Sequence, residues 1–174
     1  TEGIYIEKKW SVRGKTRGQK VQVNFWDFGG QEIMHATHQF FLTKRTVYLL
    51  VLDARKGENE SNIHYWLKII RSYGGDSPIL VVTNKCETHH LDLNETRLRQ
   101  DYPNIQGFFK TSCEKGTGIA NLKKAIMARI QAMPHVFDPL PLAYFTIKRK
   151  LETLAEQRNY LDIGDYQTLC HDQK

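Results

Sequence analysis

The sequence predicts an α/β fold with a mostly parallel sheet and one antiparallel edge hairpin, followed by a short helical segment. Residues 4–12 and 20–26 alternate apolar and polar side chains around a glycine-bearing turn, as the strands of a hairpin do. Residues 47–52 and 78–82 are short apolar runs typical of buried strands, and the amphipathic residues 61–73 separate them. This order indicates two parallel strands joined by a right-handed helical crossover.

Composition narrows the class of protein. The chain has 174 residues, 40% hydrophobic and 25% charged, which suits one globular domain with an appendage. Its 3 cysteines are odd in number and widely spaced, so we expect no disulfide framework and a reducing compartment, the cytosol. The apolar runs are too short to cross a bilayer, so we expect a soluble protein with no transmembrane segment.

The net charge of +6 is compatible with a nucleic-acid partner, but its distribution argues against one. Basic residues surround the predicted hairpin tip at residues 13–18, where a solvated charged turn is the ordinary outcome. No aromatic residues are interleaved with them, and no nucleic-acid-binding module is present. We therefore predict no nucleic-acid partner.

Residues 26–32, with the sequence WDFGGQE, follow the second hairpin strand and suggest phosphate chemistry. Asp27 can hold Mg²⁺, usually through a water molecule, and Gly30 lacks a Cβ and can present its N–H to a terminal phosphate. Gln31 then stands where an attacking water must be oriented. The alternative is an ordinary turn after a strand, because D-x-x-G alone is common.

Residues 1–4 (TEGI), the WDFGGQE stretch and the segments after it resemble the Roc GTPase domain of Roco proteins, a branch of the Ras-like P-loop GTPases. The resemblance covers residues 1–133. Residues 134–141 form a proline-punctuated linker, and residues 142–174 resemble the beginning of the COR segment that follows Roc. The resemblance implies a Ras-like G domain, GTP or GDP and Mg²⁺ as ligands, and a homodimer formed through COR.

The same resemblance assigns roles around the phosphates. Thr1 corresponds to the switch threonine, whose hydroxyl binds Mg²⁺ and whose backbone senses the γ-phosphate. Thr1 and Asp27 would therefore hold the metal, Gly30 would contact the γ-phosphate, and Gln31 would be the catalytic residue that positions water.

Residues 84–87, which follow the 78–82 strand, resemble the N-K-x-D guanine motif with Glu87 in place of aspartate. A carboxylate can accept hydrogen bonds from both N1–H and the N2 amine of guanine, a pair of donors that adenine lacks. Asn84 would brace the adjacent loops, and the Lys85 stem would cover the base. The extra methylene of Glu87 puts guanine selectivity in doubt. The alternative for this tetrapeptide is a turn at the end of a strand.

A third parallel strand at residues 107–111 leads into residues 112–114, which resemble the S-A-K loop of the family. Cys113 and Glu114 replace the alanine and lysine, but the backbone N–H of Cys113 can still reach guanine O6. Ser112 and Cys113 therefore join the predicted nucleotide-binding residues. Helices are expected at residues 94–101 and 119–133, and two more in the COR-like segment.

The phosphate-binding loop of the family lies upstream of the switch threonine and is absent from this sequence. Gly14-Lys15-Thr16 imitates its end, but Lys9 stands where its first glycine is required, and the segment lies within a hairpin. We expect either a piece of a longer protein or a relative that lost nucleotide binding. The intact WDFGGQE stretch favours the first explanation, a piece of a longer protein.

One consequence for the sheet can be tested. In Ras-like domains the strand before the phosphate loop lies between the strands that end here at Asp27 and Asp53. Residues 21–26 and 47–52 should therefore run parallel, roughly 10 Å apart, without direct hydrogen bonds.

The leading functional hypothesis is a Mg²⁺-dependent GTPase switch. The alternative is a non-catalytic scaffold whose purpose is COR docking or pairing.

Overall fold

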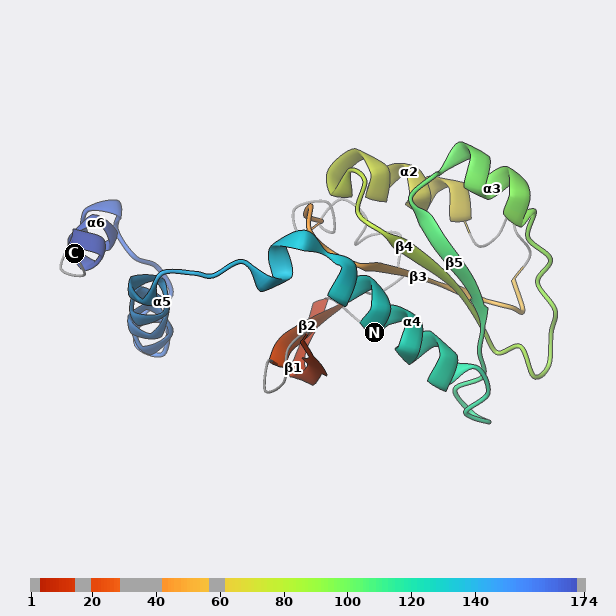
Figure 1. The fold of residues 1–174 in the computed structure, drawn as a ribbon, viewed down its shortest axis with the longest axis horizontal. Helices are drawn as coiled ribbons and strands as arrows, with labels where there is room; N and C mark the ends of the chain where they lie inside the picture. The colour runs from red at the N-terminus through yellow and green to blue at the C-terminus, as the bar shows by residue number, and fades with distance from the viewer. Residues whose placement is uncertain (1–3, 15–19, 29–41, 57–61, 172–174) are drawn as a thin grey trace. The chain divides into compact units, whose positions relative to one another are not determined.

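The computed structural model describes residues 4–14, 20–28, 42–56 and 62–171, with the backbone alone at residues 4–9 and 13. The chain divides into two compact units, Thr1–Val136 and Phe137–Lys174 (Figure 1). The boundary between the units falls inside the predicted linker. The predicted domain limits at residues 133 and 142 remain predictions.

A parallel three-stranded sheet forms the centre of the first unit, as the sequence predicts. Its order is β3 (Tyr48–Asp53), β4 (Ile79–Asn84) and β5 (Ile105–Lys110). Val81 of β4 is in register with Leu50 of β3 and Phe108 of β5. Because the strands are parallel, their carboxyl ends meet at one edge of the sheet.

The antiparallel hairpin is also confirmed. β1 (Ile4–Arg13) pairs with β2 (Lys20–Phe28), with Val12 opposite Val21. In the part of the chain that the structure describes, β2 is hydrogen-bonded to β1 and β3 to β4, and the two strand groups form separate sheets. Val23 and Leu49 are therefore not on hydrogen-bonded neighbouring strands, as predicted.

Helices cover both faces of the three-stranded sheet (Figure 1). α2 (Ile63–Gly74) and α3 (Glu95–Asp101) lie on one face and α4 (Ile119–Ala132) on the other. Asn94 caps the start of α3, where its side chain accepts a hydrogen bond from the N–H of Arg97. Gly75 directly follows α2 and has a φ of 59°, a conformation that favours glycine.

Two hydrophobic cores follow from the alternation of side chains along β4. Val81 points into the core beneath α2 and α3, where it joins Leu50 and Leu67. Leu80 points the other way, into a core with Ile126 and the hairpin residue Val12. The first five residues of the strand are buried, which confirms the expectation for residues 78–82 of a strand covered on both faces.

The same expectation is wrong for β3 at one position. Val51 is 59% exposed, although the sequence predicts that both faces of residues 47–52 are buried. Tyr48, Leu50 and Leu52 face the α2 and α3 core and are buried. Val51 lies on the opposite face, and α4 and the hairpin residues that cover Val47 and Leu49 do not cover it.

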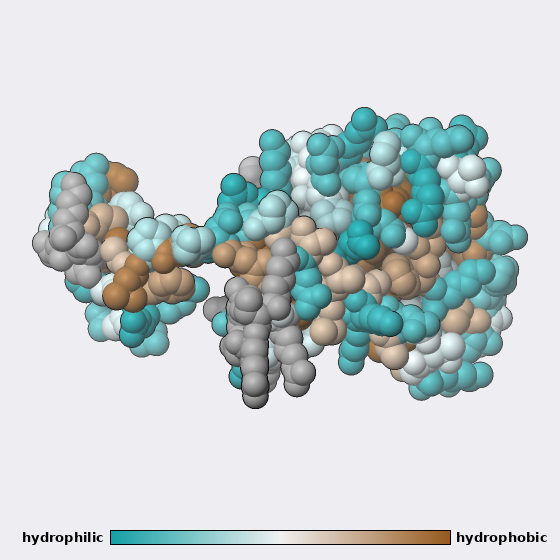
Figure 2. Space-filling model, in the orientation of Figure 1, coloured by the Kyte–Doolittle hydropathy of each residue, from teal (hydrophilic) through white to brown (hydrophobic). Residues whose placement is uncertain are grey.

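The second unit holds α5 (Leu142–Ala155) and α6 (Ile163–His171), after a 3₁₀ helix at Pro134–Phe137. Large hydrophobic side chains lie on its surface, including Leu142 at 77% exposed and Ile163 at 68% (Figure 2). Among the residues described, no helix is both long and apolar enough to span a bilayer.

Candidate functional site

The predicted base-binding residues converge where β4 and β5 end. The N–H of Thr111 donates to the carbonyl of Thr83 at 2.8 Å, and the N–H of Cys86 donates to the carbonyl of Thr111 at 3.1 Å. These bonds continue the pairing of the two strands beyond the regular sheet. They hold the Asn84–Glu87 turn against the Thr111–Cys113 segment.

Asn84 ties these two segments together through its side chain. Its Oδ1 accepts from the Thr111 hydroxyl at 3.3 Å and from the backbone N–H of Cys113 at 3.2 Å. Thr111 is buried, so its hydroxyl requires a partner inside the protein. Asn84 supplies that partner and fixes the start of the Cys113 loop.

Glu87 carries the most informative atom of the site. Its Oε2 is a buried oxygen without a hydrogen-bond partner in the described residues. The Ser112 hydroxyl, and next the backbone N–H of Glu87 itself, lower the pKa of the Glu87 carboxyl below its ordinary value, with a smaller contribution from the charges of Lys115 and Lys85. Glu87 is therefore a carboxylate at neutral pH, with acceptor capacity that this part of the chain does not use.

The loop after β5 is fixed by local hydrogen bonds around a buried serine. Ser112 is fully buried; its N–H donates to the Thr117 carbonyl at 3.0 Å and its Oγ accepts from the Lys115 N–H at 3.1 Å. Gly118, just before α4, has a φ of 74°, and a Cβ there would lie 2.1 Å from the Lys110 carbonyl oxygen. Close backbone packing thus shapes the loop that carries the exposed Cys113.

Asp53, the last residue of β3, is a site residue that the sequence analysis did not identify. Its Oδ2 lies 2.8 Å from the Nζ of Lys85 and 2.7 Å from Nη2 of Arg55. Lys85 has a φ of 65°, unusual for a lysine. The ion pair holds the Lys85 side chain across the strand ends. The sequence did contain a signal for Asp53 as a site residue, since neighbouring parallel strands that end in Asp53 and Asn84 place both residues at one edge of the sheet.

Hydrogen bonds from Arg55 and then Lys85 hold the pKa of Asp53 well below its ordinary value. The stabilisation is therefore present above the unfolded-state pKa of about 4 and is lost as pH falls through the lower folded-state pKa. We expect Asp53→Asn to destabilise the protein by about 1 kcal/mol at pH 7 and progressively less in strong acid. Urea unfolding across pH measures this. Asp92→Asn, at a side chain 97% exposed and 3.7 Å from His90, is the control for loss of a surface carboxylate and should change the free energy of unfolding less at pH 7.

Among the residues predicted to act around the phosphates and the metal, the structure describes Asp27. Asp27 lies near the end of β2, opposite Tyr5 of β1, and is exposed. Thr1, Gly30 and Gln31 lie outside the described residues. Their roles remain predictions from the sequence.

Comparison with known proteins decides the family. Residues 1–87, half of the 174-residue chain, match the family described as "Ras of Complex, Roc, domain of DAPkinase". The chain belongs to the Roc family. This Roc chain is also similar to a solved structure described as Methanosarcina barkeri Roco2 RocCORdC bound to GDP, with 43% identity and a TM-score of 0.85. That match covers 99% of this chain and 51% of the Roco2 chain and confirms the Ras-like Roc fold of a Roco protein.

Curated relatives of the Roc chain are much longer proteins. A probable serine/threonine-protein kinase, pats1 of Dictyostelium discoideum, is 31% identical over 151 residues, 80% of this chain and 5% of that protein. A Roc-COR-CHAT protease of Runella zeae is 29% identical over 160 residues, 84% of this chain and 17% of that protein. The chain thus spans a small part of each of these relatives.

Proposed function

We propose that this Roc chain binds guanine nucleotide where β4 and β5 end, and that it acts as a GTP-hydrolysing switch. The observation that carries the proposal is the buried Glu87 Oε2, which has no partner in the described part of the chain. A buried acceptor of this kind is unfavourable until a donor reaches it. Guanine presents two adjacent donors to a carboxylate, N1–H and the N2 amine, and the GDP of the similar Roco2 structure supports this base.

The neighbouring groups suit a guanine ring beside Glu87. The Cys113 N–H donates to Asn84 Oδ1, and it would turn to guanine O6 when the base enters. Lys85 is held to Asp53 through its ammonium, so its methylene stem is kept in place beside the site to cover one face of the base. Recognition would therefore use two backbone-anchored loops with little rearrangement.

The phosphates would lie toward the end of β2. Asp27 is there, and its carboxylate oxygen is the hard donor that Mg²⁺ prefers. We propose that Asp27 and the Thr1 hydroxyl hold this ion, which neutralises charge on the phosphates when bound. The Gly30 N–H would contact the γ-phosphate, and the Gln31 carboxamide would orient the attacking water.

Nucleotide carried by the purified full-length protein tests the proposed binding directly. The protein is denatured, and the supernatant is separated by ion-exchange chromatography. We expect GDP or GTP in near-stoichiometric amount. Adenine nucleotide, or no nucleotide even after incubation with GTP and Mg²⁺, would contradict the proposal and favour the scaffold hypothesis.

Replacing Gln31 tests the hydrolytic step separately from binding. We expect Gln31→Leu to slow single-turnover GTP hydrolysis about tenfold or more, because leucine cannot orient water. GTP affinity should stay within severalfold, since the side chain contacts the water rather than the nucleotide. Gln22→Leu, at an exposed position of β2, is a control and should leave the rate unchanged. An unchanged rate for Gln31→Leu would assign water positioning to another group.

We also propose that the second unit begins a COR segment through which two copies of the full-length protein pair. Its surface carries Leu142, Tyr144, Tyr160 and Ile163, each more than half exposed, and apolar surface of this kind is typical of an interface. Sedimentation should find a dimer that Leu142→Glu together with Ile163→Glu weakens. Lys150→Glu on α5 is the charge control. A dimer unaffected by the paired substitution would place the interface elsewhere.

The three cysteines support a cytosolic location, which we propose for the protein. All three are free, and Cys113 is exposed. Free exposed thiols persist best in a reducing compartment.

A further inference from the structure

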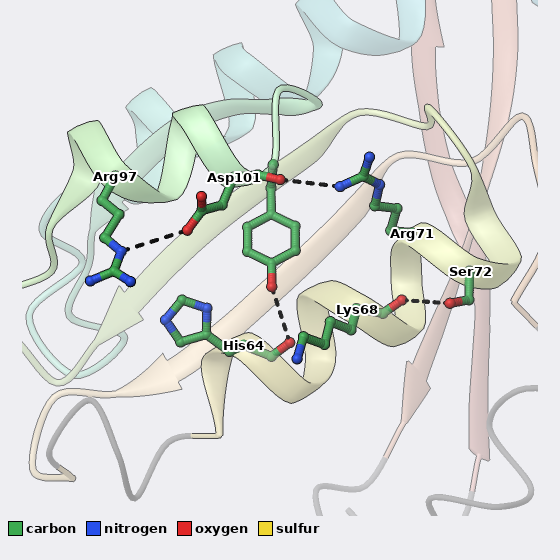
Figure 3. Close-up of a pocket in the computed structure, with 7 residues that line it drawn as sticks. His64, Lys68, Arg71, Ser72, Arg97 and Asp101 are labelled. Atoms are coloured by element: carbon green, nitrogen blue, oxygen red, sulfur yellow. Dashed lines mark hydrogen bonds and ion pairs between the residues drawn. The ribbon is translucent and has the colours of Figure 1, made fainter.

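An open groove of about 670 Å³ lies between α2 and α3, and none of the residues assigned to nucleotide binding lines it (Figure 3). Both helices contribute side chains, and most of these are polar or charged. The lining residues are His64, Lys68, Arg71 and Ser72 from α2, with Arg97, Asp101 and Tyr102 from α3 and its end.

Positive charge predominates in this groove. Lys68, Arg71 and Arg97 oppose one carboxylate, Asp101. The Asp101 carboxylate lies 3.7 Å from Nε of Arg97, and both side chains are about half exposed or more, so this pair neutralises little. Arg71 donates to the backbone carbonyl of Asp101 at 3.2 Å, which orients the guanidinium without cancelling its charge.

Of these three cations, Lys68 makes the fewest interactions through its charged group. Within the described residues its ammonium makes no ion pair, and its backbone carbonyl accepts from the Ser72 hydroxyl at 2.9 Å. Facing helices usually place opposite charges across their contact, because like charges repel. The excess of cations here therefore gives the groove a positive potential that attracts anions.

The spacing of the cations indicates the shape of that anion. Lys68 and Arg71 lie three residues apart on one face of α2, about 5 Å along the helix axis. Arg97 lies on the opposite helix, and Figure 3 shows it well apart from Arg71. The cations thus line an extended track and do not converge on one point, as they would around a single phosphate.

The floor of the groove adds no negative charge. Tyr102 is buried, and its hydroxyl reaches the His64 carbonyl at 3.5 Å. Burial, and next the charge of Asp101, raise the pKa of Tyr102, so the phenol stays neutral.

We propose that this groove docks an acidic segment of a protein partner, whose carboxylates pair with Lys68, Arg71 and Arg97. The cations are exposed along a groove between two helices with buried Tyr102 beneath, and a protruding segment fits such a groove better than a flat membrane surface does. Guanidinium groups favour carboxylates because they can donate two parallel hydrogen bonds. The site is separate from the nucleotide site, so its occupation does not depend on the function proposed above.

Binding of a fluorescein-labelled poly-glutamate peptide to the full-length protein, followed by fluorescence anisotropy, tests the proposal. We expect Lys68→Glu with Arg97→Glu to weaken binding about tenfold or more, and added salt to weaken the wild-type complex. The matched control is Lys123→Glu with Lys124→Glu on α4, which changes net charge equally outside the groove. It should reduce affinity less than threefold or so. Lys68→Gln, which removes charge without reversing it, should show a smaller loss in the same direction.

Three results would overturn the proposal. One is equal affinity for wild type, the double reversal and Lys68→Gln. Another is an equal loss in the α4 control, which would mean attraction to overall charge. The third is a different ligand: displacement of the peptide by inorganic phosphate at constant ionic strength would indicate a small-anion site, and Lys68-dependent binding to phosphatidylserine vesicles would indicate a membrane surface.

Discussion

Replacing Glu87 with alanine should weaken GDP and GTP binding about thirtyfold or more while changing the weak binding of adenine nucleotides little. The carboxylate is the one acceptor in the proposed site that two guanine donors can share, and its Oε2 is buried without a partner in the described chain. Alanine removes the acceptor that both guanine donors would share. Calorimetric titration of the nucleotide-free full-length protein measures each affinity.

Two further variants make the Glu87 result specific. Glu114→Ala removes a carboxylate from the adjacent loop, at an exposed position, and should leave GDP affinity nearly unchanged. Glu87→Asp restores the aspartate of the N-K-x-D motif and should keep or improve guanine selectivity. Equal losses of GTP and ATP affinity in Glu87→Ala would show that this loop does not read the base.

Gly118→Ala should destabilise the protein strongly, lowering the free energy of unfolding by about 3 kcal/mol or more. Its added Cβ would lie 2.1 Å from the Lys110 carbonyl oxygen and 3.2 Å from the carbonyl carbon. Both atoms belong to the last residue of β5, so backbone must move to relieve the clash. That movement would also displace Thr111 and Ser112, so nucleotide affinity should fall together with stability.

Gly116→Ala separates the clash from backbone strain. Gly116 has a φ of 71°, close to the 74° of Gly118, but a Cβ there would meet nothing within 4 Å. We expect it to lower the free energy of unfolding by only about 1 kcal/mol. Urea unfolding of both variants gives the comparison. Equal losses would mean that β5 and α4 separate easily and that the close approach stabilises little.

Strand alternation and apolar run length were enough to predict most of the fold. Residues 20–26 fall within β2, and the apolar run 78–82 identified β4, because burial on one face or on two leaves a direct pattern in sequence. The end of α2 was equally readable, since Gly74 and Gly75 follow the amphipathic run and a residue with positive φ after a helix favours glycine. The strands and the helix end could be predicted because each depends on the side chains of its own short segment.

Parts of the site that depend on partners distant in sequence could not be predicted in the same way. The Lys85 stem is predicted to cover the base, but Asp53, 32 positions away, anchors the Lys85 ammonium, and nothing in the local sequence indicates this. The Cys113 N–H is predicted to reach guanine O6, and in the structure that group donates to Asn84. The exposure of Val51 likewise depends on which elements cover one face of β3.

The β1–β2 hairpin meets the rest of its unit through side chains such as Val12 and Val23, packed with Leu80 and Ile126, and the described residues show no ladder between β2 and β3. Dispersion contacts have shallow, non-directional minima, whereas a hydrogen-bonded ladder fixes register to a single residue step. Asp27 lies on the hairpin and Glu87 just after β4, so in the described chain side-chain packing rather than a ladder sets the spacing between the proposed metal and base contacts. We expect the strand predicted between β2 and β3 to form a ladder on each side and so to fix that spacing in the full-length protein.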